Sequence, residues 1–102
     1  MIVRICGRID SGTAAAFEAH VLGLVASGVR RLVVDCEALD YISSAGLRVL
    51  LVAAKRLASG GGKIALSGVG GQIAQVFDIV GFASIFTTYA TSGDAVAALR
   101  AG

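Results

Sequence analysis

The sequence has no proline and no tryptophan, a single histidine and two cysteines, and only 16% of its residues carry charge. A chain that is 56% hydrophobic has ample apolar surface to bury, so its composition excludes an intrinsically disordered protein. A length of 102 residues suits one hydrophobic core and is too short for two. We therefore expect residues 1–102 to form a single, heavily buried domain.

No hydrophobic run reaches the roughly 18 residues that a membrane span needs. The stretch 21–26 is short, and the stretch 47–54 is interrupted by Arg48. The N-terminus also lacks the charged and apolar segments of a signal peptide. We expect a cytoplasmic protein with no membrane partner. Cys6 and Cys36 fit that compartment as small buried thiols, although the sequence alone leaves a disulfide open.

The net charge of +2 arises from nine basic and seven acidic residues that are scattered along the sequence. A nucleic-acid groove needs clustered Lys and Arg with aromatic residues between them, and the pairs 30–31 and 55–56 make no such patch. His20 has no second metal ligand at a suitable spacing and no nucleophile partner. We therefore expect no nucleic acid, no metal, no cofactor and no enzymatic activity, with His20 structural or exposed.

Hydrophobic periodicity and turn residues divide the chain into alternating strands and helices. Strands are expected at 2–6, 31–35, 63–67 and 84–86, with a loop at 36–42. Helices are expected at 14–27, from the serines at 43–44 to Ser59, at 73–80 and at 92–101. This alternation with short connections predicts an α/β fold built on a mainly parallel four-stranded sheet with about four helices. In such sheets, partners gather at the carboxyl ends of the strands, which hold Asp10, 35–44 and 67–71.

Ser43 and Ser44 stand where the loop at 36–42 turns into the second helix. Either serine would be a good N-cap, because its hydroxyl oxygen can accept a hydrogen bond from a free N–H group of the first turn. The same N–H groups and the positive end of the helix dipole would also tolerate an added phosphate, so both roles stay open. Gly46 lowers helix propensity by about 1 kcal/mol relative to Ala, so it either permits close packing or leaves backbone open to a neighbour.

The second helix has one apolar stripe that is expected to face the core. Its members are Leu47, Leu50, Leu51, Ala54, Leu57 and Ala58. The side that points away from the stripe carries Ala45, Val49, Val52 and Arg56. Two β-branched apolar residues on that side indicate a partner surface. Packing of Val49 and Val52 against another helix of the same chain is the alternative.

The segment Leu32-Val-Val-Asp35, followed by Leu39-Asp-Tyr-Ile-Ser-Ser-Ala-Gly-Leu47, resembles the phosphorylation segment of STAS domains, in particular the bacterial anti-sigma factor antagonists. In that family a strand precedes an Asp-Ser-Ser-Gly-Leu or Asp-Ser-Thr-Gly-Leu turn into a helix. The segments Gly7-Arg-Ile-Asp10, Thr13-Ala14 and Val76-Phe-Asp-Ile-Val-Gly-Phe82 are similar to further parts of the family. The resemblance covers nearly the whole chain and implies a STAS-like fold.

The resemblance implies that Ser44 is the phosphorylated residue, with Ser43 in the place of the usual Asp and as the alternative acceptor. The resemblance and the outward side of the second helix together predict the residues that bind the partner. These are Asp10, Ser43, Ala45, Gly46, Arg48, Val49 and Val52. The chain begins at what matches the family's second strand, so we also expect an open sheet edge.

The activity that the resemblance implies is a partner switch. The unphosphorylated protein would bind an anti-sigma factor that is also a serine kinase, and would thereby free the sigma factor. Phosphorylation with ATP would end the binding, and a serine phosphatase would restore it. A constitutive scaffold subunit of a signalling or transporter-associated complex, in which the serines are only caps, is the alternative.

Overall fold

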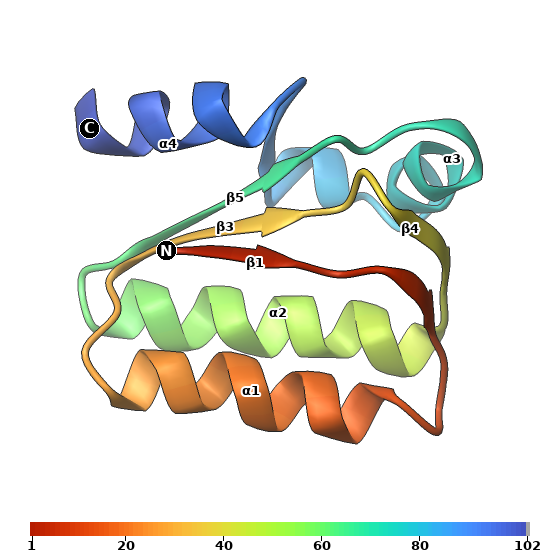
Figure 1. The fold of residues 1–102 in the computed structure, drawn as a ribbon, viewed down its shortest axis with the longest axis horizontal. Coiled ribbons are helices and arrows are strands. Elements are labelled where there is room, and N and C mark those ends of the chain that lie inside the picture. Colours follow the sequence, from red (N-terminus) through yellow and green to blue (C-terminus); the bar gives the residue numbers. More distant parts are fainter. Residues whose placement is uncertain (102) are drawn as a thin grey trace.

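A computed structural model describes residues 1–101 of the chain. Figure 1 shows the order of its elements along the chain. They are β1 (Ile2–Arg4), β2 (Gly7–Ile9), α1 (Ala14–Ala26), β3 (Arg31–Asp35), β4 (Leu39–Ile42), α2 (Ser44–Ser59), β5 (Lys63–Ser67), α3 (Gly71–Ile79), the 3-10 helix η1 (Phe82–Ser84), β6 (Thr87–Tyr89) and α4 (Ser92–Ala101).

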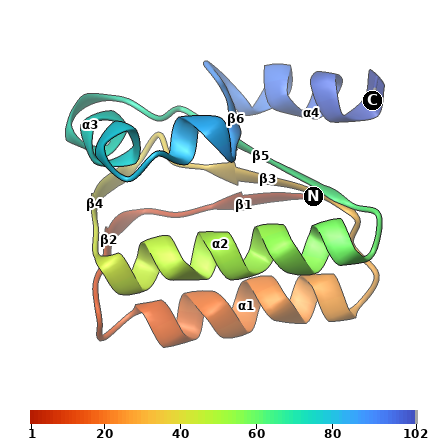
Figure 2. The ribbon, with the colours of Figure 1, turned by 180° about the vertical axis from the view of Figure 1, so that it is seen from behind.

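Four parallel strands form the main sheet in the order β1-β3-β5-β6, which confirms the predicted parallel sheet. Helices α1 and α2 lie side by side on one face, and α4 covers the other (Figures 1 and 2). The residues Leu32 to Val34 of β3 are buried because this strand has a neighbour on each side and helices on both faces. Because the four strands are parallel, their carboxyl ends lie at one end of the sheet and their amino ends at the other.

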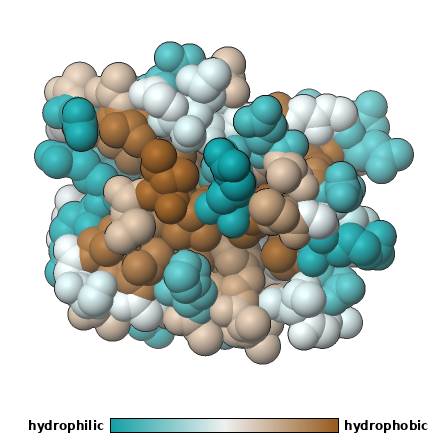
Figure 3. All heavy atoms as spheres, in the orientation of Figure 1, coloured by the Kyte–Doolittle hydropathy of each residue, from teal (hydrophilic) through white to brown (hydrophobic). Residues whose placement is uncertain are grey.

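Among the described strands, β1 lies at one edge of this sheet. Met1 and Ile2 are large apolar residues that remain exposed there. Apolar side chains gather across the middle of the molecular face on which β1 lies (Figure 3). Many edge strands are protected by charged side chains, whereas the start of β1 exposes apolar ones.

A second, two-stranded parallel sheet extends beyond the main one and overturns the predicted loop at 36–42. Strand β4 pairs with β2, with Ile42 opposite Ile9. Leu39 and Ile42 are buried while the two residues between them are exposed. The pairing joins segments about thirty residues apart in the chain, so local periodicity could not reveal it. It brings the end of β4, where α2 begins, against β2.

The strand expected at 84–86 is also wrong, because η1 occupies 82–84 and the strand follows at 87–89. One turn of 3-10 helix lets Phe82 pack against both Phe77 and Phe86, with ring centroids 5.2 and 5.1 Å apart. All three rings are buried. Aromatic packing therefore outweighed the strand tendency of this segment.

The cysteines differ in their surroundings. Cys36 is buried at the end of β3, as expected, whereas Cys6 is exposed in the link between β1 and β2, where Ile5 points inward instead. Both thiols are free. Burial, and then the neighbouring Asp35 carboxylate, raise the pKa of the Cys36 thiol to about 12. His20 is exposed on α1. None of the helices within residues 1–101 combines the length and the apolar character that crossing a membrane requires.

Candidate functional site

The two serines at the start of α2 have different roles in the structure. Ser43 is the N-cap in extended conformation, and its hydroxyl oxygen accepts a hydrogen bond from the Gly46 N–H at 3.2 Å. The Ser43 N–H in turn donates to the carbonyl of Ile9 on β2 at 2.7 Å. Ser44 is the first helical residue and is exposed. Ser43 thus supplies the cap, and the Ser44 hydroxyl lies on the surface at the helix N-terminus.

Gly46 permits close packing rather than leaving backbone free. A Cβ atom at this position would lie 2.7 Å from side-chain carbons of both Ile9 and Ile42. No side chain fits there, so the first turn of α2 rests directly on β2 and β4. Gly46 is buried. The prediction that Gly46 contacts a partner is therefore wrong, and its role is to seat the serines against the small sheet.

The prediction that Val49 faces outward is also wrong. Val49 is only 4% exposed and belongs to the main hydrophobic core. Because α1 packs beside α2, the second helix buries two sides, one on the sheet and one on α1. The same packing buries Ala53, which the predicted stripe omitted, and leaves Ala58 exposed. Val52 is half-buried, so it contributes only part of its side chain to the surface.

A shallow groove of about 240 Å³ lies between the amino ends of α1 and α2. It is lined by Ser11, Ala14, Ala15, Glu18, Ala45, Arg48 and Val49. Two predicted partner-binding residues, Ala45 and Arg48, therefore lie together on the surface, while Val49 forms the floor. Arg48 is exposed and lies four residues after Ser44, the spacing that puts two side chains on one face of a helix.

Asp10 adjoins this groove and organises the start of α1. Its Oδ1 atom accepts hydrogen bonds from the Gly12 N–H at 2.9 Å and the Thr13 N–H at 3.1 Å. The Thr13 hydroxyl also donates to Asp10 Oδ1 at 3.2 Å. These bonds, above all that from Gly12, lower the pKa of the Asp10 carboxyl group below its ordinary value. The carboxylate thus helps fix the turn before α1. Ser11 in this turn and Ala14 at the start of α1 both line the groove.

A second groove, of about 290 Å³, runs between β4 and α3 and was not predicted. Ile79 of α3 is 83% exposed and Tyr41 of β4 is 41% exposed, and both line it. The Arg8 guanidinium carbon lies 4.3 Å from the centre of the Tyr41 ring, which holds the ring at the surface. The signal available in the sequence was Ile79, an apolar residue outside the buried positions Ile73 and Phe77 of its helix.

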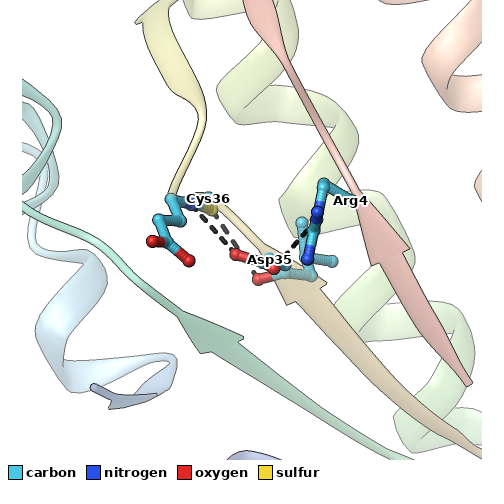
Figure 4. Close-up of polar contacts among 5 residues, drawn as sticks. Arg4, Asp35 and Cys36 are labelled. Atoms are coloured by element: carbon cyan, nitrogen blue, oxygen red, sulfur yellow. Dashed lines mark hydrogen bonds and ion pairs between the residues drawn. The ribbon is translucent and has the colours of Figure 1, made fainter. Parts of the chain in front are cut away.

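Asp35 stabilises the turn that leads from the main sheet to β4. It is buried at the end of β3, and its Oδ2 atom lies 3.3 Å from Nε of the exposed Arg4 (Figure 4). Its Oδ1 atom accepts a hydrogen bond from the Glu37 N–H at 3.0 Å. The buried carboxylate thus has partners for both oxygens. Asp35 thus links β3 to β1 through Arg4 and to the turn before β4 through Glu37.

The fold and the site together define a small α/β domain. Its candidate binding residues Ser44, Ala45 and Arg48 lie in the first turns of α2. Within residues 1–101, no group of His, Cys, Asp and Glu side chains is arranged to hold a metal ion. A family model described as the STAS domain matches residues 1–95. The chain belongs to the STAS domain family, and its fold is the STAS fold.

Several proteins similar to this chain are described as anti-sigma factor antagonists. BtrV of Bordetella bronchiseptica, described as a candidate antagonist, is 43% identical over 98 residues, which cover 96% of this chain and 84% of BtrV. The crystal structure of an anti-sigma factor antagonist from Mycobacterium paratuberculosis matches with a TM-score of 0.88 and 29% identity, over 97% of this chain and 84% of that chain. Such antagonists are non-enzymatic regulatory proteins, in agreement with the expectation that the chain is not an enzyme.

The Bacillus cell fate determinant SpoIIAA in its phosphorylated form matches with a TM-score of 0.77 and 21% identity, over 97% of this chain and 89% of that chain. At this identity the likeness shows a common fold alone.

Proposed function

We propose that the protein is an anti-sigma factor antagonist that works as a partner switch, with Ser44 as its phosphorylated residue. The unphosphorylated form binds an anti-sigma factor that is also a serine kinase, and so frees a sigma factor for transcription in the cytoplasm. Phosphorylation of Ser44 ends the binding, and a serine phosphatase restores it. The observation that carries the proposal is the exposed Ser44 hydroxyl at the start of α2, beside a cap that Ser43 already provides.

The helix start can hold a phosphate without unfolding. A phosphoserine adds about −1.5 to −2 charges, which the free N–H groups and the dipole of α2 favour at this end. Arg48, four residues along the same face, offers a guanidinium partner for that phosphate. The fold therefore stays intact, and the effect of the charge falls on the surface that the partner covers.

The proposed partner surface includes Ser44 and residues near it. It comprises Asp10, Ser43, Ala45, Arg48 and the exposed part of Val52, with the groove between α1 and α2. We add the groove between β4 and α3, because Tyr41 precedes the serines by two residues and Ile79 offers a large apolar side chain. A partner that buries an unmatched phosphate dianion on this surface loses affinity, since about 1.4 kcal/mol is already a factor of ten.

The proposal is tested by incubating the protein with a cognate serine kinase and ATP, followed by mass spectrometry of the phosphopeptide. We expect phosphate on Ser44 in the wild type and in Ser43→Ala, and none in Ser44→Ala. Protein isolated from its own cells should carry the same modification. Phosphate found on Ser43 alone would contradict the assignment of Ser44.

Binding provides the second measurement. Ser44→Asp should weaken the complex by about tenfold or more, whereas Ser44→Ala should bind like the wild type. The free Ser44→Asp protein should melt at the same temperature as the wild type or slightly above it, because an acidic residue suits a helix N-terminus. Undiminished binding by Ser44→Asp, together with a stable complex in cells, would support the constitutive scaffold instead.

A further inference from the structure

Helix stability does not explain why an arginine stands at position 48. Arg48 lies in the second turn of α2, whereas basic side chains stabilise a helix at its carboxyl end, where Arg56 lies. The residues three and four positions away on the helix carry no charge that could pair with it. They are Ser44, Ala45, Leu51 and Val52. Within residues 1–101, the only ion pair joins Arg4 to Asp35, so the Arg48 guanidinium has no carboxylate partner there.

Arg48 lines the groove between the amino ends of α1 and α2, which lie side by side (Figure 1). Most of the other lining side chains are small: Ser11, Ala14, Ala15 and Ala45. Glu18 of α1 is half-buried and lines the same groove, but it forms no ion pair with Arg48. The Asp10 carboxylate accepts hydrogen bonds within its own turn. The acidic side chains nearest the groove therefore leave Arg48 unpaired.

A phosphate on Ser44 would meet Arg48 in a favourable geometry. Four residues rise about 6 Å along an α-helix and complete roughly one turn, so the two side chains share a face. Long side chains on a helix lean toward its amino end, which directs Arg48 over the first turn. An acidic group four residues before a basic one is also the better order of the two. A phosphoserine here can bind the guanidinium through charge-assisted hydrogen bonds.

A protein that covers the groove before phosphorylation must satisfy Arg48 as well. Removing an unpaired charge from water lowers affinity, so the covering surface has to present a hydrogen-bond acceptor. A carboxylate suits the planar guanidinium best, because it accepts two parallel hydrogen bonds. The groove of about 240 Å³, with its small side chains, has room for an acidic side chain.

We propose that Arg48 is the residue through which phosphorylation releases the partner. In the unphosphorylated protein, Arg48 pairs with an Asp or Glu side chain of the anti-sigma factor kinase that enters the groove. A phosphate on Ser44 captures the same guanidinium and leaves the partner's carboxylate without its counter-charge. The phosphate competes well because it is held in the same helix at a high effective concentration. This inference rests on the proposed function and adds the partner's chemistry and the means of release.

The first test needs no partner. Phosphoserine is incorporated at position 44 during synthesis, and the second ionisation of its phosphate is followed by phosphorus NMR. Pairing with Arg48 should lower the pKa of the phosphate by about 0.5 or more relative to the same protein with Arg48→Gln. The matched control is Arg56→Gln, at an exposed position about three turns further along α2, which should leave that pKa unchanged. Equal phosphate pKa values with and without Arg48 would overturn the capture.

The second test measures binding of the unphosphorylated variants to the cognate anti-sigma factor kinase. Arg48→Gln should weaken the complex by about tenfold, whereas Arg56→Gln should bind like the wild type. Glu18→Gln should bind as tightly as the wild type or more tightly, because it removes a charge that repels an incoming carboxylate. A loss of affinity in Glu18→Gln with none in Arg48→Gln would mean that the partner brings a basic side chain, and would overturn the proposal.

The third test combines the two changes. Phosphoserine at position 44 should weaken the complex by about tenfold or more in the wild type, but by about threefold or less in Arg48→Gln, because its target is already gone. Equal losses in both backgrounds would overturn the role of Arg48 and leave the switch at Ser44 intact. If phosphoserine at position 44 does not weaken the wild-type complex, the proposed function fails, and this inference fails with it.

Discussion

The two ends of the sheet follow opposite electrostatic arrangements. At the carboxyl end, three polar side chains have partners within the chain: Asp35 pairs with Arg4, Asp10 accepts hydrogen bonds in the turn before α1, and Ser43 caps α2. At the amino end, Arg31 and Lys63 stand side by side and line one cavity, and the described residues that line this cavity include no Asp or Glu. The first arrangement holds the backbone in place around the exposed Ser44. The second leaves two like charges next to each other.

The proposed surface for a protein partner needs rigid support, because any disorder around Ser44 would add an entropic cost to binding. Three substitutions at the carboxyl end test whether its polar contacts provide the support that the comparison assigns to them.

The largest effect is expected at Asp35. Asp35→Ala removes the acceptor of the Glu37 N–H and the partner of Arg4, and should lower the free energy of unfolding by about 2 kcal/mol. Chemical denaturation measures this change. Asp35→Asn is the matched control, because its amide oxygen can still accept from Glu37, and it should cost less than Asp35→Ala. Equal losses in both variants would mean that the charge, and not the backbone contact, supports the turn.

A smaller effect is expected from the cap of α2. Ser43→Ala should destabilise the protein by about 1 kcal/mol, since it leaves the Gly46 N–H without its acceptor. Ser44→Ala changes a neighbouring serine of the same size but removes no cap, and should be nearly neutral. Thermal or chemical denaturation of the two variants distinguishes them. The reverse order of stabilities would show that the two serines do not divide their roles as the structure indicates.

The smallest effect is expected at Asp10, and it depends on pH. The pKa of its carboxyl group is lowered from an ordinary value of 3.8, so the charge stabilises the folded state fully above that pH. This stabilisation is lost as the pH falls through the lowered pKa of the folded protein. Asp10→Asn keeps an oxygen acceptor without the charge, so the stability difference between wild type and variant should shrink below about pH 3.8. A difference that stays constant down to acid unfolding would contradict a role for the charge.

The failures of sequence-based reasoning share one cause. Val49 was assigned to the surface because the periodicity of a single helix defines an inner side only with respect to one neighbour. Helix α2 has two neighbours, the sheet and α1, so a second side is buried. Tyr41 was assigned to a loop because the partner strand β2 lies more than thirty residues earlier, at Gly7–Ile9. The charges at the amino end were taken as scattered because they are far apart in the sequence.

What the sequence by itself determined was local: the helices α1, α2 and α4, the strands β3 and β5, and the pair of serines at a helix start. Periodicity, turn residues and capping residues encode these features within a few positions of the chain. Tertiary structure alone decided that Val49 is buried, that Gly46 is a packing residue, and that Arg31 faces Lys63. The physical reason is that burial and charge pairing depend on which distant segments meet, and strand register and helix packing settle that only when the whole chain has folded.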